Sequence, residues 1–455
     1  MILIKKYKFN LVFSLFVLLS FSTLFILIYN IFYYSPILGY DAQAHFSYVD
    51  YLSRYLPREI RLPGPNETRE YFNPPLGYLV PSIAQLICRN FIQSSNILAD
   101  CQPVYGKVTQ VFQSVLYIAT LLMNLYTLKL YNKSNNLVNV SYLILVSLLA
   151  VNYRTISMIR GEPYILFFLS LFLLIIFKVE KNNYILDFKY IFFTGVVIAC
   201  IALSRQWGFL LFPPLIILLF SANSKTKYFR FWAYSSSLGA LLSSWFYIGL
   251  YQRFGSFTSF NMESKGLDFS NQNYSFYIPN SKHLEYLFFK PIRPHLDNQF
   301  FSILYSDLWG DYWGYFSFTS RNLAVGRNQL QIGDLMARVN IISILTSLII
   351  VSFCYLTFKK HKSSLFIRYI NLAIFVSFFG YLLFAITFPT SSGDTIKSTY
   401  IIQAFHLMVF LASIYFHELE KTNKKIYYAV LFLLVGIYVH NFQTFLSHFP
   451  INYYP

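Results

Sequence analysis

Residues 11–33 read LVFSLFVLLSFSTLFILIYNIFY, a stretch without a charged side chain. A helix of this length crosses a hydrocarbon core about 30 Å thick. The stretch is longer than the roughly 7–15 apolar residues of a cleaved signal peptide, and no small-x-small cleavage site follows it. We therefore interpret it as a retained first transmembrane helix.

The composition extends this interpretation to the whole chain. Hydrophobic residues make up 56% of the 455 residues and charged residues only 12%, compared with about 25% charged residues in a soluble domain. The net charge of +17 is spread between apolar runs, which argues against nucleic-acid binding. We expect a single integral membrane domain over residues 1–455, surrounded by membrane lipids.

Apolar runs and their basic flanks predict an all-α polytopic membrane protein of about eleven spans. With the N-terminus in the cytoplasm, every inner connection is basic, as the positive-inside rule requires. The predicted spans are 11–34, 104–128, 137–153, 162–177, 190–204, 208–222, 231–250, 340–358, 367–388, 399–416 and 426–441.

The basic residues differ between the two sides of the predicted membrane. Sixteen of the eighteen inner ones are lysine, including Lys5, Lys6 and Lys8, whereas thirteen of the eighteen outer ones are arginine. Arginine binds phosphate bidentately, so the outer arginines suggest phosphate recognition, although pairing with carboxylates in ordered loops fits equally well.

Two long segments are predicted on the outer side, 35–103 and 251–339. Residues 74–92 are apolar but interrupted by proline, and counting them as a span would reverse every later connection. We expect them to form a helix in the membrane interface. Cys88 and Cys101 lie close enough in sequence for a disulfide in this outer segment.

The first outer segment begins with Gly39-Tyr40-Asp41-Ala42-Gln43-Ala44-His45-Phe46. In a helix over 41–52, Asp41 and His45 share one face. A carboxylate at this place can accept the proton of an attacking hydroxyl, and His45 is the candidate catalytic residue that assists it. Asp41 could instead cap the helix, and His45 could be a structural hydrogen-bonding residue.

The segment continues with Glu70-Tyr71-Phe72-Asn73-Pro74-Pro75-Leu76-Gly77-Tyr78. An acidic residue directly after the first span, followed by this aromatic and proline-rich segment, resembles the first outer loop of the GT-C glycosyltransferases. The protein O-mannosyltransferase and aminoarabinose transferase branch, with bacterial relatives of family 39, is the most similar. Shorter similarities are residues 158–163 (MIRGEP), 203–208 (LSRQWG) and 397–400 (KSTY).

The resemblance implies a GT-C-like helical membrane scaffold with interfacial helices in the first outer loop. It also implies transfer of a sugar from a polyprenyl-phosphate donor to a lipid, glycan or protein acceptor, with inversion. Asp41 takes the role of base, although many relatives have Asp-Glu where this chain has Asp41-Ala42. Arg160, Arg205 and Lys397 are the candidates for binding the donor phosphate at outer ends of spans.

Residues 305–315, YSDLWGDYWGY, combine carboxylates with aromatic rings, as sugar-binding sites do. An interfacial aromatic belt would have the same composition. The candidate acceptor or sugar contacts are Asp307, Trp309, Asp311, Trp313 and Tyr400.

An outer-face glycosyltransferase in a bacterial inner membrane is thus the leading functional prediction. A transporter or flippase of lipid-linked oligosaccharide is the alternative, and it would favour ionisable residues and broken helices near the midplane. A non-catalytic assembly scaffold is a third. No metal-ligand spacing is apparent and no cofactor is expected, but a divalent metal stays possible.

Overall fold

The computed structural model describes residues 11–93, 101–133, 139–222, 224–258, 260–318 and 327–447. The inner lysines Lys5, Lys6 and Lys8 lie outside this part of the chain. The described residues form helices joined by turns and loops, with no β-strand among them. The prediction of an all-α polytopic membrane protein is confirmed.

Within the described residues, seven helices are long and apolar enough to cross a membrane. An eighth candidate is the broken pair α5 (Val140–Ser147) and α6 (Ala150–Ser157), which bends by 66°. The seven are α1 (Leu11–Tyr33), α4 (Cys101–Tyr131), α7 (Glu162–Lys181), α14 (Arg327–His361), α15 (Leu365–Thr387), α16 (Ile402–Thr422) and α17 (Lys424–Asn441).

Three further predicted spans fall on helices that do not meet this test. They are α8 (Phe188–Ser204), the segment Gln206–Ser221 that contains α9 (Pro213–Leu218), and α10 (Lys225–Phe254). The first two are short, and α10 carries several basic residues and serines along its 30 residues. The count of eleven spans therefore stays a prediction.

α16 lies at the centre of the bundle and packs against α14, α15, α5 and α17. In the most apolar 18-residue stretch that includes α16, 89% of the residues are buried inside the protein. In the corresponding stretch of α1, only 22% are buried. The short helix η6 (Ser398–Ile401) leads into α16. The residues just before α16, including Lys397, are buried as well.

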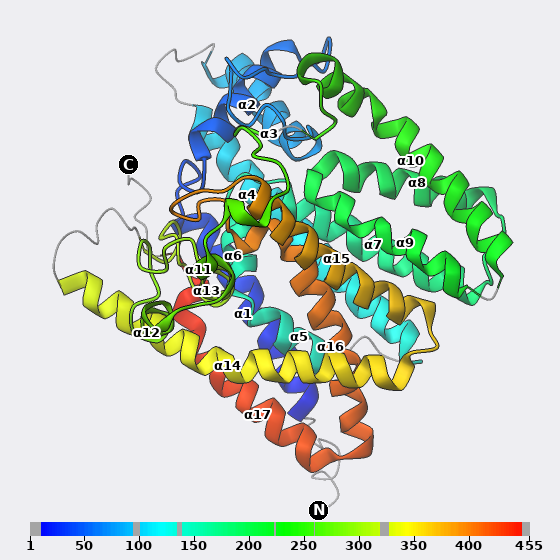
Figure 1. The fold of residues 1–455 in the computed structure, drawn as a ribbon, viewed down its shortest axis with the longest axis vertical. Helices are drawn as coiled ribbons and strands as arrows, with labels where there is room; N and C mark the ends of the chain where they lie inside the picture. The colour runs from blue at the N-terminus through cyan, green and yellow to red at the C-terminus, as the bar shows by residue number, and fades with distance from the viewer. Residues whose placement is uncertain are drawn as a thin grey trace, which may run out of the picture.

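The first outer segment folds over one end of the bundle. α1 runs up to the end where α2 (Ala42–Tyr55) and α3 (Leu76–Cys88) lie (Figure 1). α3 contains Pro81, continues directly into the π-helical segment η1 (Arg89–Gln93), and is not among the described helices that qualify as candidate spans. A disulfide joins Cys88 at the end of α3 to Cys101 at the start of α4, which confirms the predicted pairing.

The second outer segment contributes three short helices, α11 (Tyr274–Tyr277), α12 (Ser281–Phe289) and α13 (Phe300–Trp309). α13 contacts α6, α14 and η6. This packing brings the segment 305–315 against the residues that lead into α16.

The sidedness of these segments is testable by cysteine labelling in intact cells, in a background where Cys200 and Cys354 are replaced. We expect a membrane-impermeant maleimide to modify the variant Ser270→Cys and to leave Thr226→Cys unmodified. The reason is that basic residues flank position 226, as expected for an inner connection. Labelling of Thr226→Cys without labelling of Ser270→Cys would reverse the predicted topology.

Candidate active site

Asp41 occupies the junction between α1 and α2. Its backbone is left-handed, with φ 55°, a conformation that aspartate tolerates better than most residues. Asp41 is the residue that precedes α2, but its side chain makes no capping hydrogen bond. The capping interpretation is therefore not supported, and the carboxylate is directed to other partners.

Those partners are cations from distant parts of the sequence. The Lys397 Nζ atom lies 3.2 Å from Asp41 Oδ2, and the Arg69 guanidinium forms an ion pair with Asp41 Oδ1. The ammonium of Lys397, together with Arg160 and Arg69, lowers the pKa of Asp41 well below its usual range, against the opposing effect of burial. The Asp41 carboxylate is consequently ionised at neutral pH.

Lys397 is itself held tightly. Its backbone N–H donates to the Tyr381 hydroxyl at 2.5 Å, and only 9% of its side chain is exposed. Its ammonium lies 5.0 Å from the centre of the Tyr40 ring and 5.5 Å from that of Tyr400. Two aromatic faces therefore stabilise this cation beside Asp41.

Asp41 and Lys397 line a polar cavity of about 540 Å³. It is built from the first outer segment, the second outer segment and the α15–α16 connection. The other lining residues are Tyr40, Arg69, Glu70, Phe260, Asn261, Met262, Arg293, Trp313, Tyr315, Thr390, Asp394, Thr395 and Tyr400.

Glu70 is a second cavity carboxylate, for which the sequence alone predicts no role. Burial raises its pKa, while Arg205 opposes that rise. The Asn73 side-chain amide donates to Glu70, and Arg205 Nη1 lies 3.8 Å from Glu70 Oε2. Asp41 and Glu70 therefore line the same cavity, although Ala42 and not an acidic residue follows Asp41 in the sequence.

Arg205 and Arg160 form a buried basic group near Glu70. Arg205 Nε donates to Glu162 Oε1 at 3.0 Å, and Arg160 Nη2 donates to the Tyr40 carbonyl at 2.8 Å. Arg160 Nε and Nη1 and Arg205 Nη1 have no hydrogen-bond partner within the described residues. Arg205 Nη1 still has its 3.8 Å ion-pair contact with Glu70, and Arg160, unlike Arg205, lines none of the cavities described here.

Close packing at Gly161 brings these arginines together. A Cβ atom on Gly161 would lie 2.2 Å from the Ser204 carbonyl oxygen and 2.7 Å from Arg205 Cγ. Only glycine permits this approach. The sequences 158–163 and 203–208, each a weak signal alone, therefore meet in space.

His45 does not join the cavity. Its Nδ1 lies 2.7 Å from the Tyr78 hydroxyl, its ring stacks on Tyr78, and burial lowers its pKa well below the usual value. It is 2% exposed and is not a lining residue. We do not propose His45 as a catalytic residue.

The aromatic and acidic segment 305–315 is divided between two environments. Trp313 lines the cavity, as does Tyr400, whereas Asp307, Trp309 and Asp311 are not lining residues. Asp307 and Asp311 are fully buried and pair with Arg154, with nearest N–O distances of 3.0 Å and 3.8 Å. The prediction of acceptor contacts is therefore not retained for Asp307, Trp309 and Asp311.

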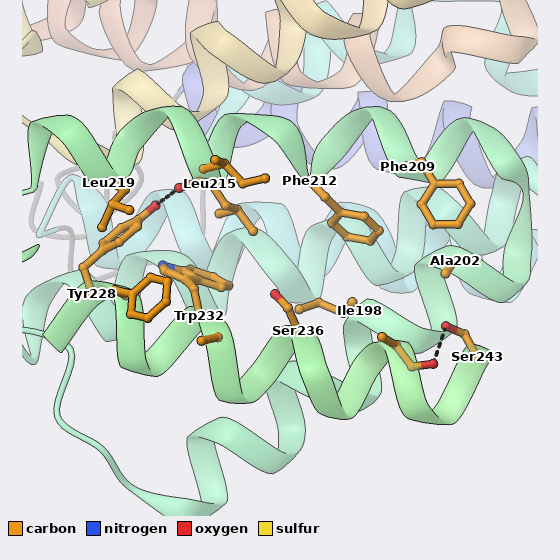
Figure 2. A pocket seen from close by; sticks show the side chains of 14 residues that line it. Ile198, Ala202, Phe209, Phe212, Leu215, Leu219, Tyr228, Trp232, Ser236 and Ser243 are labelled. Atoms are coloured by element: carbon orange, nitrogen blue, oxygen red, sulfur yellow. Dashed lines mark hydrogen bonds between the residues drawn. The ribbon is translucent and has the colours of Figure 1, made fainter. Parts of the chain in front are cut away.

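Two further cavities follow the polar one, each sharing lining residues with its neighbour. A cavity of about 230 Å³ shares Phe260 and Tyr400 with it and is also lined by Arg205 and Trp207. A third, of about 390 Å³, shares Phe209 with the second and lies between α8, α9 and α10. Figure 2 shows its lining of aromatic and aliphatic side chains, with Tyr228 and Trp232 at one end and Phe209 at the other.

No protein-family model matches this chain, and no curated protein matches it. The described residues also contain no group of three or more His, Cys, Asp or Glu side chains placed to hold a metal ion. Functional assignment therefore depends on the geometry of the cavities and their residues.

Proposed function

We propose that this protein is a membrane glycosyltransferase that moves a sugar from a polyprenyl-phosphate donor to an acceptor hydroxyl on the outer face. The observation that carries the proposal is a series of three cavities in which each shares lining residues with the next. The first contains acidic and basic side chains, the second contains Arg205 among aromatic ones, and the third is almost wholly apolar. This order matches the sugar, phosphate and prenyl tail of one lipid-linked donor.

The phosphate has a candidate site where the first two cavities meet. Tyr400 lines both cavities. Lys397 also lines the first cavity, and Arg205 also lines the second. Arg160 lines neither cavity, and its guanidinium donates to the Tyr40 carbonyl. We propose that Lys397 and Arg205 neutralise the phosphate that leaves when the glycosidic bond breaks, and that Arg160 adds positive charge from outside the cavity lining.

Asp41 is the proposed base. In the absence of donor its pKa is lowered, chiefly by Lys397, which makes it a weak proton acceptor. A phosphate that attracts Lys397 would weaken this ion pair and allow the pKa of Asp41 to rise toward its ordinary value. Binding of the donor would thereby prepare Asp41 to accept the acceptor's hydroxyl proton.

The apolar cavity gives a test that is specific to the prenyl tail. Ser236 on α10 lines this cavity, whereas the neighbouring Ser237 does not. We expect Ser236→Trp to fill the cavity and to raise the KM for a long-chain donor about tenfold or more, because several buried CH₂ groups lose their site at about 0.8 kcal/mol each. Initial transfer rates measured with long-chain and two-isoprene donors provide the comparison.

Ser237→Trp is the matched control, since it adds the same side chain one residue along α10. Both variants should use the two-isoprene donor as the wild type does. An unchanged KM for the long-chain donor in Ser236→Trp would remove this cavity from the donor site.

One observation favours the alternative, a transporter or flippase of lipid-linked oligosaccharide. The break of 66° between α5 and α6 is the kind of interrupted span that transporters use at substrate sites. A flippase would move the lipid between leaflets of a liposome without cleaving its glycosyl-phosphate bond. Analysis of the intact lipid after incubation distinguishes the two functions.

A further inference from the structure

Asp307 contacts both residues that adjoin the Asp41–Lys397 pair. The Tyr40 hydroxyl donates to Asp307 Oδ1 at 3.1 Å. The Ser398 backbone N–H and hydroxyl donate to Asp307 Oδ2 at 2.8 Å and 2.6 Å. Tyr40 directly precedes Asp41, and Ser398 directly follows Lys397, so one carboxylate connects the two sides of the site.

Arg154 fixes that carboxylate in place. Its Nη2 atom lies 3.0 Å from Asp307 Oδ1 and also donates to the Asp307 backbone carbonyl at 2.7 Å. Its Nη1 atom donates to the Gly310 carbonyl at 2.6 Å. Arg154 is 1% exposed, so its hydrogen bonds to the end of α13 are shielded from solvent.

Asp311 provides an internal comparison. It also pairs with Arg154 and is equally buried, but its Oδ2 atom accepts from the backbone N–H groups of Phe316 and Ser317 at 2.8 Å each. None of its described hydrogen bonds goes to Tyr40 or Ser398. Asp311 therefore orders its own loop, whereas Asp307 reaches residues on both sides of the cavity.

We propose that Asp307 is a positioning residue that sets the distance between Asp41 and Lys397. It holds the Tyr40 ring beneath the Lys397 ammonium and fixes the backbone from which Lys397 extends. The placement of Lys397 is a property of the folded protein alone, whereas its importance for sugar transfer rests on the proposed function.

The experiment measures how well Lys397 is protected. The purified full-length protein is treated with N-hydroxysulfosuccinimide acetate, and acetylation of Lys397 is followed by mass spectrometry. Lys107 is the internal reference, because this half-buried lysine donates to the Tyr34 carbonyl at 2.8 Å, and its described contacts do not include Asp307. The variants are Asp307→Asn and, as the matched control, Asp311→Asn.

We expect the ratio of Lys397 to Lys107 acetylation to rise about tenfold in Asp307→Asn, the change that follows the loss of one charge-assisted hydrogen bond. The ratio in Asp311→Asn should stay near that of the wild type. An unchanged ratio in Asp307→Asn, or an equal rise in both variants, overturns the proposal. If Asp307→Asn does not fold, Tyr40→Phe and Ser398→Ala each remove one side-chain contact with Asp307. The same rise in the Lys397 to Lys107 ratio is expected for these two variants, and an unchanged ratio in both overturns the proposal.

This assay requires no sugar transfer, so its outcome is separate from that of the proposed function. In a transferring enzyme, Asp307→Asn should lower kcat/KM strongly in the wild-type background and less than about threefold in a Lys397→Met background, because residues linked through one hydrogen-bond network are energetically coupled. Equal losses in both backgrounds would show that Asp307 does not act through Lys397.

Discussion

Asp41→Asn should lower the turnover number about 100- to 10,000-fold while leaving the yield of folded protein unchanged. A positioned carboxylate contributes this much when it accepts a proton in the rate-limiting step. Asparagine keeps the size of the side chain, tolerates the left-handed backbone, and removes only the charge. Initial rates of transfer at saturating donor, normalised to folded protein, measure the loss.

A matched control is available on α2, the helix that follows Asp41. Asp50 lies on α2 and accepts from the Tyr105 hydroxyl at 3.3 Å, but it is not a cavity residue. Asp50→Asn should retain turnover within a few-fold of the wild type. If Asp41→Asn transferred sugar at a near-normal rate, Asp41 would not be the base, and Glu70 and Asp394 would be the remaining cavity carboxylates.

The largest effect on stability is expected from Arg154→Met. This substitution leaves Asp307 and Asp311 buried without their shared cation, and breaking a buried ion pair from one side costs about 3–5 kcal/mol of unfolding free energy. Thermal unfolding of the purified protein in detergent should show a clear fall in the apparent melting temperature. Adding Asp307→Asn and Asp311→Asn to Arg154→Met should recover part of the loss, since the orphaned charges are then removed.

Lys282→Met is the control for this prediction. Lys282 lies 3.5 Å from Asp297, with 59% of each side chain exposed, so solvent screens the pair. Its substitution should hardly change the melting temperature. A similar fall in melting temperature for Lys282→Met and Arg154→Met would show that burial of the Arg154 ion pairs with Asp307 and Asp311 adds nothing to stability.

Local sequence patterns predicted the membrane-spanning class and a separate helix over 74–92, whose place in the membrane interface stays a prediction. The apolar run 11–33 and the proline-interrupted run 74–92 differ in length and in helix breakers, and these properties are read directly from neighbouring residues. The number of spans was harder to predict, because the 30-residue α10 combines basic residues and serines with apolar ones.

The candidate site could be predicted only in part. Asp41 was identified from its position after the first span, but its partner Lys397 is 356 residues away in sequence. Glu70 begins the segment 70–78, but no feature of the neighbouring sequence indicates that it lines the same cavity as Asp41. Contacts of this range depend on how the helices pack.

The segment 305–315 shows the same limit. Its carboxylates and aromatic rings are equally compatible with a sugar site and with a buried ion cluster. Burial of Arg154 on α6 decides between these for Asp307 and Asp311, and Arg154 carries no local signal that it pairs with either. Trp313, in the same segment, does face the cavity.

The most direct test of the account is transfer by the purified protein from a mixture of polyprenyl-phosphate sugars with radiolabelled sugar groups, in the presence of membrane-derived acceptors. The account predicts that label leaves the polyprenyl phosphate and appears in a product that is stable to the mild acid that cleaves the donor, and that Asp41→Asn abolishes this transfer. Donor lipid that crosses liposome leaflets with its glycosyl-phosphate bond intact, and with no labelled product, would contradict it.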